Sequence, residues 1–135
     1  MRIQITLGEV HALADLFPEK APRTVPAFLD LLPLEGPAVH GRWSGQVFWI
    51  KRPLPDLPEE NPVHLLPPGA LVVLPGAGEI MVSVGEAAVH NALGLPRTAN
   101  WIGQVVANLE PLCAIGRELQ VTGSRPVRFG RAAGT

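Results

Sequence analysis

Hydrophobic and polar residues alternate in several short stretches of the chain, and a period of two is typical of half-buried β-strands. The clearest stretch is RIQITL at 2–7, which is followed by Gly-Glu and a second alternating stretch at 10–16. Together they predict a β-hairpin at the start of the chain. Further strands are predicted at 70–75 and 79–85 around a Gly-Ala-Gly turn, at 101–106, at 126–131, and as a pair within 38–51 that meets near Ser44-Gly45.

Helical spacing occurs in two places. Within 25–32, apolar side chains fall on one helical face, Thr24 precedes them as the expected N-cap, and Pro26 lies in the first turn, where its missing N–H is tolerated. Asn108 is the expected N-cap of a second helix that runs to Leu119. The buried face of this second helix is expected to consist of Leu109, Leu112, Cys113 and Gly116.

A proline-rich segment separates the two halves of the chain. So many prolines within 52–68 are incompatible with a helix interior or a central strand, but the leucines among them favour packing against the rest of the protein. Residues 86–100 are expected to form a loop with one short helical turn. Many strands with two separated helices favour a barrel or sandwich over βαβ units. We therefore predict one domain over 1–135, mainly β, with an excursion at about 52–68.

Composition excludes some partners. The net charge is −1 and no basic run occurs, which argues against nucleic acid. No apolar stretch is long enough for a signal peptide or a membrane span, so no membrane partner and a cytoplasmic location are expected. Charged residues form only 17% of the chain, which predicts apolar surface available for a homo-oligomer or a lined pocket. The high content of proline and arginine is compatible with a thermophile.

The single cysteine, the histidines and the glycine-rich turn give little support for a nucleophilic thiol, a metal site or a phosphate-binding loop. Cys113 has the surroundings of a helix face, so a buried structural thiol is expected. The four histidines lack the close spacing of a compact metal site, and no metal or cofactor is predicted. The GAGE stretch at 76–79 is not followed by a helix, so it is interpreted as a hairpin turn and not as a phosphate loop.

Three stretches resemble the cyclophilin-like superfamily, and specifically its small, uncharacterised bacterial and archaeal branch. They are ADLFPEKAPRTVPAFLDLLP at 14–33, PPGALVVLPGAGEIMVSVG at 67–85, and IGQVVANLEPLCAIGREL at 102–119, where Asn108 replaces the usual glycine. The resemblance implies a closed eight-stranded β-barrel capped by two α-helices.

The same resemblance identifies candidate site residues and their departures from the prolyl isomerases of the family. The isomerases place an arginine directly after a histidine, whereas here Arg42 lies two residues beyond His40. The aromatic floor of their proline pocket corresponds to EIMV, so Met81 takes its place. Trp101 is displaced from the position of the family's loop tryptophan. Because most of the isomerase pattern is missing, activity does not follow from the fold.

If 39–44 form a strand, alternation places His40, Arg42 and Ser44 on the outer face and Val39, Gly41 and Trp43 inside. An outward Arg42 could hold a carboxylate or carbonyl of a ligand, or pair with Glu79, Glu35 or another surface acid. Trp49 is expected to serve packing.

These observations leave three hypotheses. The first is a domain that binds a small molecule or an extended, proline-containing peptide on the outer barrel face, without efficient isomerase activity, through His40, Arg42, Met81 and Trp101. The second is a peptidyl-prolyl cis-trans isomerase with Arg42 as the catalytic residue. The third is an oligomerisation module that uses the proline-rich segment.

Overall fold

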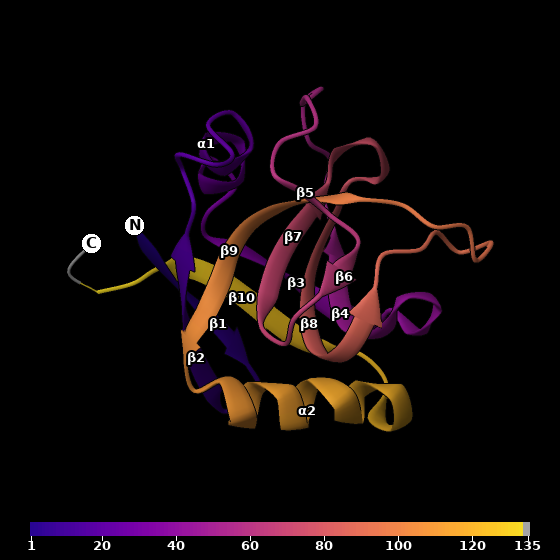
Figure 1. Cartoon of the computed structure of the whole chain (residues 1–135). Helices are drawn as coiled ribbons and strands as arrows, with labels where there is room; N and C mark the ends of the chain where they lie inside the picture. The colour runs from indigo at the N-terminus through magenta and orange to yellow at the C-terminus, as the bar shows by residue number, and fades with distance from the viewer. Residues whose placement is uncertain (134–135) are drawn as a thin grey trace.

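The computed structural model describes residues 1–133, and in these residues eight strands close into an antiparallel β-barrel (Figure 1). In ring order they are β2 (Val10–Leu16), β1 (Arg2–Leu7), β10 (Arg125–Arg131), β3 (Leu34–His40), β4 (Gly45–Lys51), β8 (Glu79–Ala88), β7 (Ala70–Leu74) and β9 (Ala99–Ala107). Pairing of β9 with β2 completes the ring. The mainly β fold and the closed eight-stranded barrel are therefore confirmed.

The first hairpin has the alternation that the sequence predicts. β1 and β2 pair from Arg2 opposite Asp15 to Leu7 opposite Val10. The inward residues of β1 are completely buried, whereas Arg2 and Asp15 form an ion pair on the outside, with Nε and Oδ1 2.7 Å apart. Gly8 in the connecting turn has a φ of 58°, which glycine adopts without a steric penalty.

The helix α2 (Leu109–Thr122) lies across one end of the barrel (Figure 1). Leu112, Cys113, Gly116 and Leu119 are buried on its inner face, largely as the spacing predicts. Asn108 precedes the helix with a left-handed φ of 59°, and its Nδ2 donates to the His11 carbonyl at 2.8 Å. Asn108 is the N-cap residue as predicted, but its side chain makes no capping bond and ties the helix to β2 instead.

The helix α1 (Thr24–Leu29) lies near the other end of the barrel (Figure 1). Its Phe28 packs edge-on against Phe129 in the core, with ring centroids 6.0 Å apart. Thr24 is the first helical residue and not the residue before the helix, and no side chain of α1 makes a capping bond, so its predicted role as N-cap is wrong. The cap comes from Glu60, whose Oε1 accepts from the Thr24 N–H at 2.7 Å. The helix also ends earlier than predicted, before Asp30.

The proline-rich excursion contains two short strands, β5 (Pro62–Val63) on β9 and β6 (Leu65–Leu66) on β8. Together with the barrel it forms a second apolar cluster that is separate from the barrel core. The fully or almost fully buried members of this outer cluster are Val47, Leu66, Ala70, Val72, Met81, Val89 and Ala99. The excursion therefore packs against the barrel, as its leucines indicate.

Two short turns complete the described chain, namely η1 (Arg42–Ser44) and η2 (Pro75–Ala77), both 3₁₀ helices. β8 continues to Ala88, so the loop expected from residue 86 begins only after that strand. Within residues 1–133, neither α-helix has the length and apolar character needed to cross a membrane.

Candidate functional site

The stretch that was expected to be a strand at 39–44 changes direction instead. β3 ends at His40, and Arg42–Ser44 form η1, in which the Ser44 N–H donates to the Gly41 carbonyl at 2.8 Å. Gly45 then starts β4 with a φ of 99°, and a Cβ there would lie 2.6 Å from the Glu86 carbonyl oxygen. Because a turn interrupts the strand, the predicted alternation of faces is wrong.

His40 faces the inside of the barrel, opposite to the outer face that we expected. It pairs with Phe48, which belongs to the barrel core, and is only 7% exposed. Its Nε2 lies 3.0 Å from Gln46 Oε1, and its Nδ1 has no partner among the described residues. Val39, which was expected inside, is 38% exposed.

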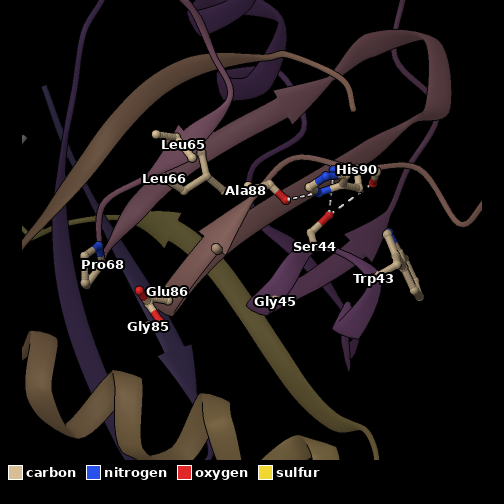
Figure 2. A pocket seen from close by; sticks show the side chains of 11 residues that line it. Trp43, Ser44, Gly45, Leu65, Leu66, Pro68, Gly85, Glu86, Ala88 and His90 are labelled. Atoms are coloured by element: carbon tan, nitrogen blue, oxygen red, sulfur yellow. Dashed lines mark hydrogen bonds between the residues drawn. The ribbon is translucent and has the colours of Figure 1, made fainter. Parts of the chain in front are cut away.

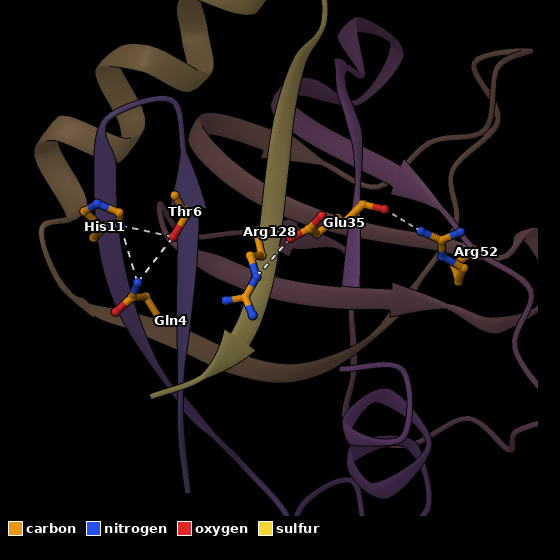
Figure 3. Close-up of polar contacts among 6 residues, drawn as sticks. All are labelled: Gln4, Thr6, His11, Glu35, Arg52 and Arg128. Atoms are coloured by element: carbon orange, nitrogen blue, oxygen red, sulfur yellow. Dashed lines mark hydrogen bonds and ion pairs between the residues drawn. The ribbon is translucent and has the colours of Figure 1, made fainter. Parts of the chain in front are cut away.

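Arg42 is exposed on η1, where its carbonyl accepts from the Gly45 N–H, and its side chain makes no hydrogen bond or ion pair within residues 1–133. Of the acids considered as its partners, Glu35 accepts from Arg128 Nε at 3.0 Å on another part of the barrel wall (Figure 3). Glu79 forms no ion pair with any described residue. The Arg42 guanidinium is thus available to solvent.

Met81 is buried and Trp101 is half-buried. Met81 is fully buried in the outer apolar cluster, so it does not line an open groove. Trp101 packs edge-on against Phe17 with ring centroids 5.6 Å apart, and its Nε1 donates to the Gly103 carbonyl at 2.8 Å. The structure therefore does not bring together the four candidate residues named above.

Two cavities lie instead on either side of Trp43 and His90. The first, which we call the Leu66 cavity, has a volume of about 570 Å³ and is drawn in Figure 2. It is lined by Trp43, Ser44, Gly45, Leu65, Leu66, Pro68, Gly85, Glu86, Ala87, Ala88 and His90. Most of these side chains are apolar or small.

The second, which we call the Arg97 cavity, has a volume of about 400 Å³. It is lined by Trp43, Leu74, Pro75, Gly76, Ala77, Glu79, His90, Asn91, Ala92, Arg97 and Thr98. Both volumes fall within the range of roughly 300–1,000 Å³ that is common for small-molecule sites. The Arg97 cavity differs from the first by containing charged groups of both signs.

Hydrogen bonds hold the wall between the cavities in place. Ser44 Oγ accepts from the His90 N–H at 3.0 Å and donates to the His90 carbonyl at 3.1 Å (Figure 2). Trp43 packs edge-on against Trp49, with ring centroids 5.7 Å apart. Ser44 and the tryptophan pair thus fix the shared wall from the side of η1.

The loop after β8 brings Arg97 beside this wall. Asn91 Oδ1 accepts from the N–H groups of Leu93 and Leu95, each at 3.0 Å, which folds the loop back on itself. The Arg97 N–H then donates to the Val89 carbonyl at 2.9 Å. Arg97 Nη1 donates to the Pro96 carbonyl, and no acid of the described chain forms an ion pair with this guanidinium.

Glu79 faces the same cavity from the start of β8. Burial raises the pKa of its carboxyl, and Lys51 on the neighbouring strand opposes this effect. No hydrogen bond within residues 1–133 satisfies the carboxylate. Glu79 was expected only as a partner of Arg42. Arg97 was not expected at a site, because nothing in the local sequence pattern indicates that the loop folds back.

Two histidines also meet at this site although they are far apart in sequence. The rings of His64 and His90 are 5.3 Å apart between centroids, at an interplanar angle of 68°. No group of three or more His, Cys, Asp or Glu side chains suitable for a metal occurs in the described part of the chain.

The amino-acid sequence matches the model of one protein family over nearly its whole length. The family model described as Protein of unknown function (DUF3830) matches residues 3–131. No curated protein matches the sequence.

Solved structures show the same fold at low sequence identity. A structure of McbB in complex with tryptophan is 20% identical, with a TM-score of 0.75. The match covers 98% of this chain but only 45% of McbB, so the chain spans less than half of that protein. The solution structure of the hypothetical protein AF2241 from Archaeoglobus fulgidus is 23% identical, with a TM-score of 0.70, and the match covers 98% of this chain and 95% of that one.

The mimivirus cyclophilin is 16% identical, with a TM-score of 0.52, and the match covers 96% of this chain and 85% of the viral one. These likenesses agree with the closed barrel and its two helices, and they establish the cyclophilin-like fold. Since the family model spans nearly all of the sequence, the chain belongs to the family described as Protein of unknown function (DUF3830).

Proposed function

We propose that this protein binds a small molecule that carries an acidic group, a basic group and an apolar ring, and that the Arg97 cavity is the binding site. The observation that carries the proposal is the presence of Glu79 and Arg97 in one cavity beside Trp43, with neither charge in an ion pair within residues 1–133. Glu79 is half-buried, and charges removed from water are ordinarily paired, so a ligand with a positive group fits beside it. The exposed guanidinium of Arg97 lines the same cavity and can hold a negative group of that ligand.

Each wall of the cavity matches one part of such a ligand. The planar guanidinium of Arg97 suits a carboxylate, which it can hold through two parallel hydrogen bonds. An ammonium group beside Glu79 would offset the burial that raises the pKa of that carboxyl. Trp43 offers an aromatic surface against which a flat apolar group would pack.

The structural likeness to McbB is consistent with this ligand class. That protein was solved in complex with tryptophan, an amino acid with a carboxylate, an ammonium and an aromatic ring. The likeness therefore supports tryptophan as the probe for the Arg97 cavity.

The binding experiment uses tryptophan as the probe, titrated into the protein by calorimetry. Tryptamine, which lacks the carboxylate, and indole-3-propionate, which lacks the amine, test the two charged contacts. Glu79→Gln and Arg97→Gln should each weaken tryptophan binding about tenfold or more, since a hydrogen bond to a charged group contributes roughly 1.5–3 kcal/mol.

The ion pair between Glu35 and Arg128 provides matched controls with the same chemical changes (Figure 3). Glu35→Gln and Arg128→Gln should leave tryptophan binding unchanged. Equal binding of tryptophan by all four variants, or no binding by the wild type up to millimolar concentration, would contradict the proposal.

The isomerase alternative has less support. Arg42 lines neither cavity, and Met81, the counterpart of the proline pocket floor, is fully buried. We expect neither the wild type nor Arg42→Ala to accelerate the cis-to-trans conversion of an Ala-Xaa-Pro-Phe peptide in NMR exchange. Acceleration by the wild type that Arg42→Ala loses would establish the isomerase instead.

Self-association is a second candidate, favoured by exposed leucines. Leu65 at the proline-rich segment is 73% exposed, and Leu93 in the loop after β8 is 85% exposed. An interface between copies of the chain would need these side chains to be part of a contiguous apolar patch, because singly exposed leucines are common on any protein surface. Light scattering of the wild type and of a Leu65→Ser, Leu93→Ser double variant tests this, since a mass that rises with concentration only in the wild type would support it.

A further inference from the structure

We propose that His64 and His90 form a two-histidine site for a divalent transition-metal ion such as Zn²⁺, Ni²⁺ or Cu²⁺. His90 also lines the Arg97 cavity, but the proposal does not depend on the ligand proposed there, because neither histidine is assigned a contact with that ligand and His64 lines neither cavity. It replaces the expectation that the four histidines lie too far apart in the sequence to share an ion.

The hydrogen bonds of the two rings involve Nδ1 in each case, and neither Nε2 has a partner among residues 1–133. His90 Nδ1 lies 3.0 Å from the Ala88 carbonyl oxygen, and His64 Nδ1 lies 2.9 Å from the Arg97 carbonyl oxygen. A carbonyl only accepts, so both Nδ1 atoms carry the proton, and in the neutral ring Nε2 then holds the lone pair. An Nδ1–H that donates to a backbone carbonyl is the usual second contact of a histidine that binds metal through Nε2.

The separation of the rings suits a shared ion. With nitrogen–metal distances of about 2.0–2.1 Å, two imidazoles on one tetrahedral ion have ring centroids roughly 5 Å apart. The observed separation is 5.3 Å. The ring planes are inclined at 68°, so the two rings meet edge to face and are not stacked face to face.

The backbone around the pair is already ordered without an ion. The Val89 N–H donates to the His64 carbonyl at 2.8 Å, which joins the segment between β5 and β6 to the loop after β8. The backbone of His90 is held by Ser44 (Figure 2). An ion would therefore bind to a prepared pair with little loss of chain entropy.

Two imidazoles select the class of metal. Imidazole nitrogen suits Cu²⁺, Ni²⁺ and Zn²⁺, whereas Mg²⁺ and Ca²⁺ prefer oxygen. Because the described residues provide no third ligand of the usual types, water or a bound molecule would complete the coordination. We expect Cu²⁺ to bind more tightly than Ni²⁺ or Zn²⁺, and Mg²⁺ not to bind at this pair.

The test uses the full chain without a histidine tag, titrated with Zn²⁺, Ni²⁺ or Cu²⁺ alone. His64→Ala and His90→Ala should each reduce affinity more than about tenfold, since each removes half of the protein ligands. His11→Ala is the matched control, because His11 lies on the hairpin β1–β2, where its Nδ1 contacts Thr6 Oγ1 at 3.1 Å (Figure 3). Its affinity should equal that of the wild type.

A measurement on the wild type avoids dependence on how the variants fold. Paramagnetic Cu²⁺ at substoichiometric amounts should broaden the ring proton NMR signals of His64 and His90 before those of His11 and His40. Broadening of His11 first, affinities of His64→Ala and His90→Ala equal to the wild type, or no binding below about 100 µM would each overturn the proposal. Tryptophan binding is also measured for His64→Ala. Tryptophan binding that this variant retains would show that a failure of the metal site does not count against the ligand site in the Arg97 cavity.

Discussion

Glu60 caps the helix that begins at Thr24, although the two residues lie far apart in the chain. One carboxylate oxygen, Oε1, accepts from the Thr24 N–H and from Thr24 Oγ1, each at 2.7 Å. Asn100 completes the network, because its Oδ1 accepts from the Glu60 N–H and its Nδ2 donates to Thr24 Oγ1. The proline-rich excursion, α1 and β9 thus meet at one largely buried polar cluster.

Glu60→Ala should therefore destabilise the protein by about 1–2 kcal/mol, the usual effect of losing a good N-cap. Urea denaturation followed by circular dichroism measures this free energy of unfolding. Glu59→Ala is the control, because Glu59 accepts only from Thr98 Oγ1 at an exposed position and its loss should change stability by less than about 0.5 kcal/mol. Equal losses in the two variants would show that the cap contributes nothing specific.

The same cap predicts a dependence of stability on pH. Burial alone would raise the pKa of Glu60, but the hydrogen bonds from Thr24 and Arg23 outweigh it and hold that pKa below its usual range. A lowered pKa in the folded state contributes stability above the unfolded pKa, and this contribution is lost as the pH falls through the folded pKa. Urea midpoints between pH 6 and pH 3 should fall more steeply for the wild type than for Glu60→Gln.

Gly116 allows α2 to approach the barrel. A Cβ at this position would lie 2.6 Å from Val84 Cγ1 and 3.2 Å from Val84 Cβ. Gly116→Ala gains about 1 kcal/mol of helix propensity but overpacks this contact, which typically costs about 1–3 kcal/mol, so the variant should unfold at lower urea. Gly76→Ala, where a Cβ meets nothing within 4 Å, should leave the midpoint unchanged.

Cys113 should resist modification in the folded protein. It is 6% exposed on the inner face of α2, and burial raises the pKa of its thiol. Both effects keep the reactive thiolate rare and inaccessible. A thiol-specific reagent such as Ellman's reagent should therefore react slowly with native protein and fast in urea. Fast reaction under native conditions would contradict the structural role expected from the sequence.

The alternation in β1 and β2 predicted their hairpin and its buried face because every side chain there faces either the core or water. The same argument was wrong at His40, since β3 ends there and Gly41 turns the chain into η1. A glycine with no helix or strand pattern after it gives only a weak signal for such a change. The period of two holds only while the strand continues.

The candidate site was harder to predict because its parts come from distant segments. Met81 lies under the proline-rich excursion, and a strand pattern does not indicate what covers its outer face. Likewise, the pairing of His64 with His90 requires β6 to lie on β8, which no local pattern shows. The resemblance to cyclophilin-like proteins predicted the barrel and its two helices. The cavities could not be predicted in this way, because they depend on segments where this chain differs from the isomerases.

The half-buried carboxyl of Glu79 should lower the stability of the folded protein at neutral pH. Because burial raises the pKa of Glu79 in the folded state, the group favours folding below its unfolded pKa, and this contribution is lost as the pH rises through the folded pKa. At pH 7 the ionised carboxylate is therefore a source of instability, and Glu79→Gln should raise the urea midpoint there. Glu35→Gln removes only an exposed ion pair and should lower the midpoint slightly or not at all.

If Glu79 serves to bind an ammonium group, saturating tryptophan should stabilise the wild type more than Glu79→Gln, since only the wild type then gains a partner for its buried charge. A Glu79→Gln variant that is less stable than the wild type at pH 7 would show that the carboxylate has a favourable contact in the free protein, and would remove the main reason to expect a ligand beside it.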